Sequence, residues 1–194
     1  IHGILHQGSK AMIAGASKTN KSWFQIDLGL SIAFGKPFLG IPTTQAPVLF
    51  LNLEIKPYFF RQRVKAIALA KGIKDFHEGV FRVWNLRGFS MKYNEFLSEA
   101  MPRMIDLKPG AVLTDPIYKL QGGAVENAAE EMALMLNEFD RIPTECGAAH
   151  CFSHHFAKGN AALKESIDRA SGSGVFARDP DTIITLTRHQ KEDH

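Results

Sequence analysis

Short apolar runs alternate along this chain with longer segments in which apolar and polar residues recur at helical spacing. Continuous apolar runs are typical of parallel strands that are buried on both faces. We expect strands over residues 11–14, 48–53, 80–84, 111–114, 147–152 and 182–187. The segments between them predict helices over residues 23–34, 57–71 and 126–140. This alternation predicts an α/β fold with a mostly parallel central sheet flanked by helices.

The predicted helices have boundaries or faces that fit packing against a sheet. Gly35 ends the first helix, and Pro57 begins the second, which is basic and amphipathic. The third helix has one apolar face, made of Ala128, Met132, Met135, Leu136 and Phe139. Two connections, over residues 118–125 and 156–178, are too long for simple turns and follow strands, which marks them as functional or disordered segments.

Composition places the chain among ordinary globular proteins. Its 194 residues are 45% hydrophobic and 22% charged, which is enough for one α/β domain over residues 1–194. Both ends look cut, so we expect a fragment of a longer chain. Its first residues do not show the basic-then-apolar order of a signal peptide, and no apolar run approaches about 18 residues, so we expect a cytoplasmic protein with no membrane partner. The net charge of +3 permits nucleic-acid contact without demanding it.

The two cysteines agree with a reducing compartment. Cys146 and Cys151 are expected in one strand, five positions apart and on opposite faces of it. That arrangement makes a disulfide between them implausible. Reduced thiols fit a cytoplasmic location.

A glycine-led turn between the first strand and the first helix predicts a phosphate-binding loop. Its residues are Gly15, Ala16, Ser17, Lys18, Thr19, Asn20, Lys21, Ser22 and Trp23. Backbone N–H groups in such a turn surround a polyphosphate, and the helix N-terminus adds its dipole. Lys21 is expected to reach the β- and γ-phosphates of a nucleotide, and Ser22 to ligate Mg²⁺. The alternative is an ordinary strand-turn-helix with exposed lysines.

Asn20 stands where the usual pattern G-x-x-x-x-G-K-[ST] has its second glycine. Asparagine takes a positive φ more readily than other residues that carry a side chain, so Asn20 can occupy the same left-handed turn. Lys18 inside the loop adds a second cation near the phosphates or faces solvent.

Two predicted strands end in an acid. Asp115 follows the strand over 111–114. In P-loop enzymes, a carboxylate at such a strand end holds Mg²⁺ opposite the hydroxyl of the phosphate-binding loop. The alternative for Asp115 is a turn former before a proline. Glu54 follows the strand over 48–53 and could polarise the water that attacks the γ-phosphate. The alternative for Glu54 is an ion pair with Arg61 or Arg63.

Histidines and cysteines gather at the end of the strand over 147–152. Cys146, His150, Cys151, His154 and His155 include enough ligand types for zinc, but alternate side chains of a strand point to opposite faces. We therefore expect one of His154 and His155 to bond the γ-phosphate or Glu54, and the other to pack or to anchor the next loop. A purely structural pair is the alternative.

The segment over 156–178 carries a cluster of cations. They are Lys158, Lys164, Arg169 and Arg178. Such a segment could contact a nucleic-acid backbone or supply an arginine to the γ-phosphate of a neighbouring subunit. A solvated surface loop is the alternative.

Taken together, these motifs resemble the RecA-like ATPases. The loop over 15–22, Glu54, Asp115 and the pair His154-His155 before Lys158-Gly159-Asn160 carry the resemblance. The chain is most similar to the AAA_25-like group that includes the plasmid hexameric replicative helicase RepA and many phage and prophage proteins. Supporting details are Ala33-x-Gly35-x-Pro37-x-Leu39-Gly40 and Asp168-Arg169-x-Ser171-Gly172-Ser173.

The resemblance implies a RecA-type P-loop fold that binds ATP and Mg²⁺ between the subunits of a ring. It also implies the roles given above to Lys21, Ser22, Glu54 and Asp115, a γ-phosphate contact for His154 or His155, and an arginine acting in trans at Arg178. The leading hypothesis is an ATPase motor or loader, such as a helicase, acting on single-stranded DNA in replication or recombination of a mobile element. The alternatives are a nucleotide-gated module with little hydrolysis and a zinc-binding structural domain.

Overall fold

A computed structural model describes residues 1–89, 91–120, 129–155 and 179–187 of the chain. A six-stranded sheet forms the centre, and every pair of neighbouring strands is parallel, in the order β3-β2-β4-β5-β1-β6. The strands are β1 (Lys10–Gly15), β2 (Val48–Asn52), β3 (Phe81–Asn85), β4 (Ala111–Asp115), β5 (Ala149–His155) and β6 (Thr182–Leu186). The predicted α/β fold with a parallel central sheet is confirmed.

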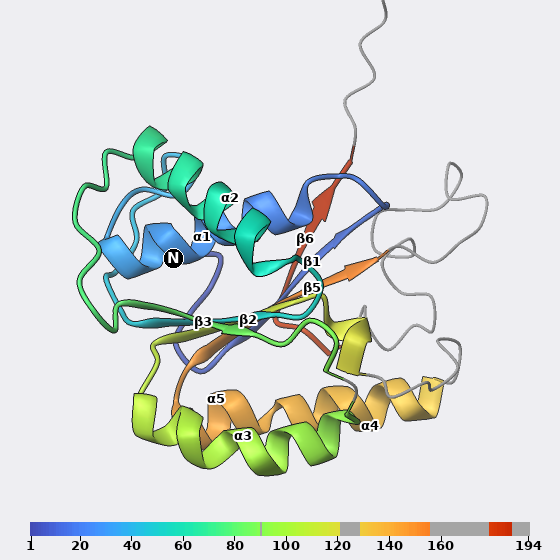
Figure 1. The fold of residues 1–194 in the computed structure, drawn as a ribbon. Coiled ribbons are helices and arrows are strands. Elements are labelled where there is room, and N and C mark those ends of the chain that lie inside the picture. The colour runs from blue at the N-terminus through green and yellow to red at the C-terminus, as the bar shows by residue number, and fades with distance from the viewer. Residues whose placement is uncertain (90, 121–128, 156–178, 188–194) are drawn as a thin grey trace, which may run out of the picture.

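Helices cover both faces of this sheet (Figure 1). One face carries α1 (Lys21–Phe34) and α2 (Pro57–Ala70), and the other carries α3 (Tyr93–Leu107), α4 (Ala129–Phe139) and α5 (Arg141–Cys146). A short 3₁₀ helix, η1 (Ile117–Leu120), follows β4. Alternate residues of one strand enter opposite cores: Phe50 packs with the α1 and α2 layer, and Leu51 packs with the other. Burial on both faces explains the continuous apolar runs.

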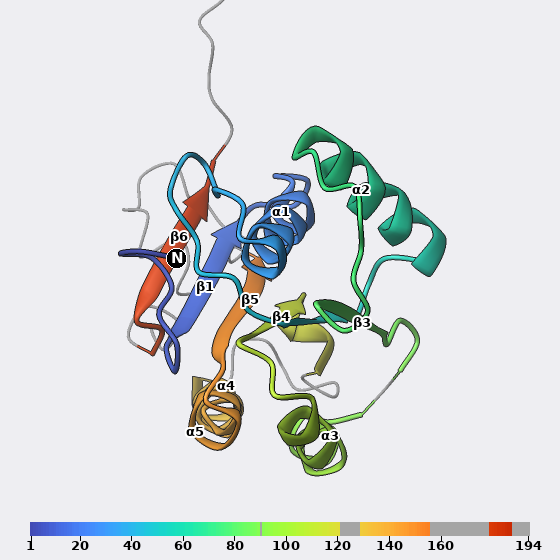
Figure 2. The same cartoon turned by 90° about the vertical axis from the view of Figure 1, so that its left-hand side faces the viewer.

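The strand order determines which side chains meet at the edge of the sheet. Because the strands are parallel, all of their C-terminal ends lie on the same side. Figure 2 shows β5 between β1 and β4. The register pairs Gly15 with His155 and Asn52 with Asp115. The loop after β1 and the ends of β2, β4 and β5 are therefore neighbours in space.

Three features differ from the sequence prediction. Helix α3 was not predicted, although Phe96, Leu97 and Met101 are buried in it. Cys146 ends helix α5 instead of lying in the following strand, so the prediction that both cysteines share one strand is wrong. The physical reason is Gly147, which takes φ 64° and ends the helix in a left-handed turn. Strand β5 begins later than expected and runs on to His155.

Candidate functional site

The loop between β1 and α1 has the conformation that the sequence predicts. Asn20 lies at φ 63° and ψ 25°, in the left-handed region, and its side chain makes no capping hydrogen bond. Lys18 also has a positive φ, of 62°. A Cβ on Gly15 would lie 2.6 Å from Thr19 Oγ1 and 2.9 Å from the carbonyl oxygen of Leu186. Glycine is therefore required at the start of the loop, while Asn20 replaces glycine at its end.

The side chain of Lys21 folds back against the start of this loop. Its ammonium donates hydrogen bonds to the carbonyl oxygens of Gly15, at 2.9 Å, and Ala16, at 2.8 Å. It also lies 3.2 Å from His155 Nδ1. Burial lowers the pKa of Lys21, and the nearby Asp115 and Glu54 carboxylates oppose that shift. The cation is thus held at the mouth of the loop by main-chain oxygens.

Asp115 ends β4 and is almost fully buried. The Ser153 hydroxyl donates a hydrogen bond to its Oδ1. Its Oδ2 is buried and has no hydrogen-bond partner among the residues that the structure describes. Burial raises the pKa of Asp115, whereas the hydroxyls of Ser153 and Ser22 and the Lys21 ammonium lower it. A free carboxylate oxygen beside the Ser22 hydroxyl fits Mg²⁺, which prefers oxygen ligands and binds proteins through one or two carboxylates together with substrate phosphates.

Glu54 lies just beyond β2 and is exposed. The Tyr118 hydroxyl donates a hydrogen bond to Glu54 Oε1 at 3.3 Å. Within the described residues Glu54 makes no ion pair with Arg61 or Arg63, so that alternative for Glu54 is wrong. The Arg63 guanidinium instead lies over the ring of Trp23, 5.2 Å from its centroid.

These groups line one cavity of about 340 Å³. It is bounded by the loop after β1, the first turn of α1, the ends of β2, β4 and β5, η1 and the middle of α2. Its lining residues are Ser17, Lys18, Thr19, Asn20, Lys21, Ser22, Trp23, Glu54, Arg63, Asp115, Pro116, Tyr118 and His155. The structure therefore brings the predicted loop, Glu54 and Asp115 together, as ligand binding at the C-terminal edge of a parallel sheet requires.

A protein-family comparison identifies the kind of domain that carries this cavity. The family model AAA_25, described as an AAA domain, matches residues 1–161. The chain belongs to this family. No curated protein matches the chain. The match supports a P-loop ATPase, a class of protein that binds nucleotide, and the cavity of this AAA domain contains the predicted phosphate-binding loop.

The neighbouring histidines His154 and His155 of this AAA domain point to opposite faces of β5. His155 lines the cavity beside Lys21. His154 is buried on the other face, and burial, followed by the charges of His155 and Lys21, lowers its pKa to about 4. His154 is therefore neutral at pH 7. Of the two, His155 is the histidine at the cavity, and its bond to a γ-phosphate stays a prediction.

His150 belongs to the core and not to a metal centre. Its Nε2 lies 3.0 Å from Thr114 Oγ1, and its ring stacks on Phe139 at 5.2 Å between centroids. Burial lowers its pKa to about 3. Over the described ranges, no group of three or more histidine, cysteine or acidic side chains could hold a metal ion. The zinc alternative therefore has no ligand set in that part of the chain.

Sequence reasoning missed three residues that shape the site: Gln25, Ser153 and Tyr118. The Gln25 amide donates to the carbonyl oxygens of Thr114, at 3.2 Å, and Cys151, at 2.9 Å, and so joins α1 to β4 and β5. Ser153 could have been found, because it shares a strand face with His155. The position of Tyr118 depends on the turn into η1, which no sequence pattern indicates.

Several predicted functional residues lie outside the described residues. Arg178 and the other loop cations, Lys158, Lys164 and Arg169, are among them. Most of the connection over 118–125 also lies there. Their roles remain predictions.

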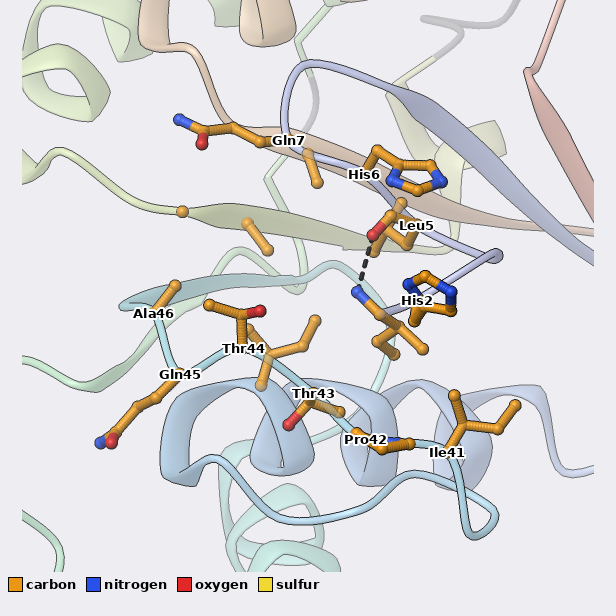
Figure 3. Close-up of a pocket in the computed structure, with 15 residues that line it drawn as sticks. His2, Leu5, His6, Gln7, Ile41, Pro42, Thr43, Thr44, Gln45 and Ala46 are labelled. Atoms are coloured by element: carbon orange, nitrogen blue, oxygen red, sulfur yellow. Dashed lines mark hydrogen bonds between the residues drawn. The ribbon is translucent and has the colours of Figure 1, made fainter.

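A second cavity, of about 810 Å³, lies at the opposite edge of the sheet (Figure 3). The N-terminal segment, including His2 and His6, forms one side, and residues 41–46 form another. The ammonium of Ile1 donates a hydrogen bond to the carbonyl oxygen of Leu5 at 2.7 Å. This cavity shares no lining residue with the cavity beside the loop after β1, so the two are separate. In the part of the chain that is described, no helix is long and apolar enough to cross a membrane.

Proposed function

We propose that this domain hydrolyses ATP in a Mg²⁺-dependent reaction and belongs to a DNA motor or loader. The observation that carries the proposal is the convergence of Lys21, Asp115 and Glu54 on one cavity beside the loop. Phosphoryl transfer needs mainly positioning and charge stabilisation, and these side chains provide both.

Each residue has a distinct role in the proposal. Lys21 and the loop N–H groups hold the phosphates, and Ser22 and Asp115 hold Mg²⁺. Held by these two residues, Mg²⁺ would supply positive charge to neutralise the phosphate oxygens. Glu54 orients the attacking water and accepts its proton. His155, which lies next to Lys21, is placed to respond to the γ-phosphate.

The resemblance to the RepA group supports the finer proposal of a helicase or loader in replication or recombination of a mobile element. In this proposal ATP lies between the subunits of a homo-oligomeric ring in the cytoplasm, and Arg178 of one subunit reaches the γ-phosphate in the next. Tyr58 and Phe59, both exposed at the start of α2, fit a subunit contact near the site. The net charge of +3 is compatible with single-stranded DNA as a partner.

A second candidate is a nucleotide-gated binding module with little turnover. The contacts of Lys21 favour it, because its ammonium must leave two carbonyl oxygens before it can reach a phosphate. Lys18 and Asn20 also have positive φ although neither is glycine, so the loop stores conformational strain. Such strain is typical of segments that switch conformation, which further favours the module. In this case ATP would order a neighbouring segment and remain bound.

Steady-state hydrolysis of ATP with Mg²⁺, with and without single-stranded DNA, distinguishes the two candidates. Lys21→Ala is the control for contaminating ATPases. Turnover that depends on Lys21 and rises with DNA would support the motor. Tight ATP binding with no turnover under either condition would support the module and reject the motor.

A further inference from the structure

We propose that Tyr118 is a positioning residue for ATP hydrolysis, which acts by holding the carboxylate of Glu54 in the cavity. This inference rests on the proposed function of Glu54 as the group that accepts a proton from the attacking water. It adds a residue on η1 that no sequence motif indicates.

The contacts of Tyr118 join the two strand ends that frame the cavity. Its hydroxyl donates to Glu54 Oε1 at 3.3 Å, and its ring lies 5.5 Å from the ring of His155. His155 in turn lies 3.2 Å from the ammonium of Lys21. One side chain therefore touches both the proposed water-activating group and the histidine beside the phosphate-binding lysine.

Glu54 needs such a restraint because little else holds it. It is exposed, and among the described residues it has no ion pair that would fix its side chain. Two of the cations that line the cavity with it are engaged elsewhere: Lys21 bonds to main-chain oxygens, and Arg63 stacks on Trp23. A free glutamate side chain samples several rotamers, and most of them point away from the reacting atoms.

The hydrogen bond leaves the chemistry of Glu54 intact. A carboxylate has two oxygens, and Tyr118 occupies only Oε1. The other oxygen, Oε2, remains available to accept the proton of the water. Tyr118 itself gains or loses no proton in this scheme, so its contribution is geometric.

The position of Tyr118 also links Glu54 to the metal site. Tyr118 follows Asp115 by three residues, on the short helix that begins just after β4. Ile117 and Leu120, on the same short helix, are fully buried, which fixes that helix against the core. A tyrosine on a rigid support can hold a neighbouring side chain more closely than one on a free loop.

The test compares Tyr118→Phe with the parent protein in steady-state hydrolysis and in calorimetric binding of a non-hydrolysable ATP analogue with Mg²⁺. We expect kcat to fall about tenfold, because a small misplacement of a reacting group is costly, while KM and analogue affinity stay unchanged. Tyr93→Phe, which removes the same atom from a half-buried tyrosine on α3, is the matched control and should behave as the parent. An unchanged or increased kcat in Tyr118→Phe would overturn the proposal, and so would an equal loss of analogue affinity.

A double-mutant cycle separates this proposal from the proposed role of Glu54. Adding Tyr118→Phe to Glu54→Gln should cause no further loss of kcat, because the tyrosine acts through the glutamate. An additional tenfold loss would show that Tyr118 acts elsewhere, with the role of Glu54 intact. Parental turnover in Glu54→Gln alone would instead refute the role of Glu54 itself.

Discussion

Asn20 makes a quantitative test of the phosphate-binding loop possible. It occupies the left-handed region at φ 63°, is exposed, and makes no side-chain capping hydrogen bond. Replacing it by alanine therefore removes no buried contact. The substitution does place alanine, which tolerates a positive φ poorly, at a position that requires a positive φ.

The expected cost follows from that conformation. An ordinary L-residue loses about 1 kcal/mol or more in the left-handed region, so Asn20→Ala should lower the free energy of unfolding by about 1 kcal/mol. Asn20→Gly relieves the strain, which stabilises the folded protein, but it also gives the unfolded chain more conformational freedom, which destabilises the fold. These opposing effects are each roughly 0.5–1 kcal/mol. The glycine variant should therefore unfold within about 0.5 kcal/mol of the parent.

Urea unfolding, followed by circular dichroism without nucleotide, measures the difference. With a slope of about 2 kcal/mol/M, the midpoint of Asn20→Ala should fall by about 0.5 M. Ser17→Ala, at an exposed loop position without a positive φ, is the matched control and should leave the midpoint unchanged. If Asn20→Ala is as stable as the parent, or if the glycine variant loses as much as the alanine variant, the assignment of Asn20 as a glycine substitute is refuted.

Three further predictions concern the loop, the core and the pH dependence of stability. Gly15→Ala should abolish calorimetric ATP binding, because the added Cβ would lie 2.9 Å from the carbonyl oxygen of Leu186; retained affinity would contradict the need for glycine. Lys10→Met should lower the free energy of unfolding in urea by roughly 2 kcal/mol, because the buried Lys10 ammonium lies 2.6 Å from the carboxylates of both Asp140 and Asp179. An unchanged urea midpoint would show that these ion pairs do not stabilise the fold. Stability should fall as the pH drops from 6.5 toward about 4, because His154, like the buried His150, binds its proton less readily in the folded protein than in the unfolded chain. His154→Gln should make this part of the profile less steep, leaving the contribution of His150, and the exposed His6→Gln should not change it; a profile that His154→Gln leaves unchanged would show that His154 does not contribute.

The sequence predicted the fold well because buried parallel strands leave a strong pattern. Each residue of β2, Val48–Asn52, is buried, so the run is continuously apolar until its last position. The spacing of the glycine and the lysine after β1 predicts a loop that surrounds a phosphate, and phosphate binding there stays a prediction. Asn20 was interpreted correctly because its tolerance for positive φ is a property of the residue itself.

Other parts could not be read from the sequence. Helix α3 contains Pro102, a residue that usually ends a helix, yet Pro102 is exposed here and the flanking Met101 and Met104 are buried. Choosing between His154 and His155 required the phase of β5, which the pairing of His155 with Gly15 determines. Both examples depend on tertiary contacts that a local pattern does not contain.

The most direct test of the central claim measures ATP binding and ATP turnover separately in Glu54→Gln. We predict parental affinity for ATP with Mg²⁺ and single-turnover hydrolysis at least about a hundredfold slower, because only the proton acceptor is removed. Glu99→Gln, an exposed glutamate on α3, should match the parent in both measurements. Hydrolysis by Glu54→Gln at the parental rate, or a parent protein that binds no ATP, would contradict the account.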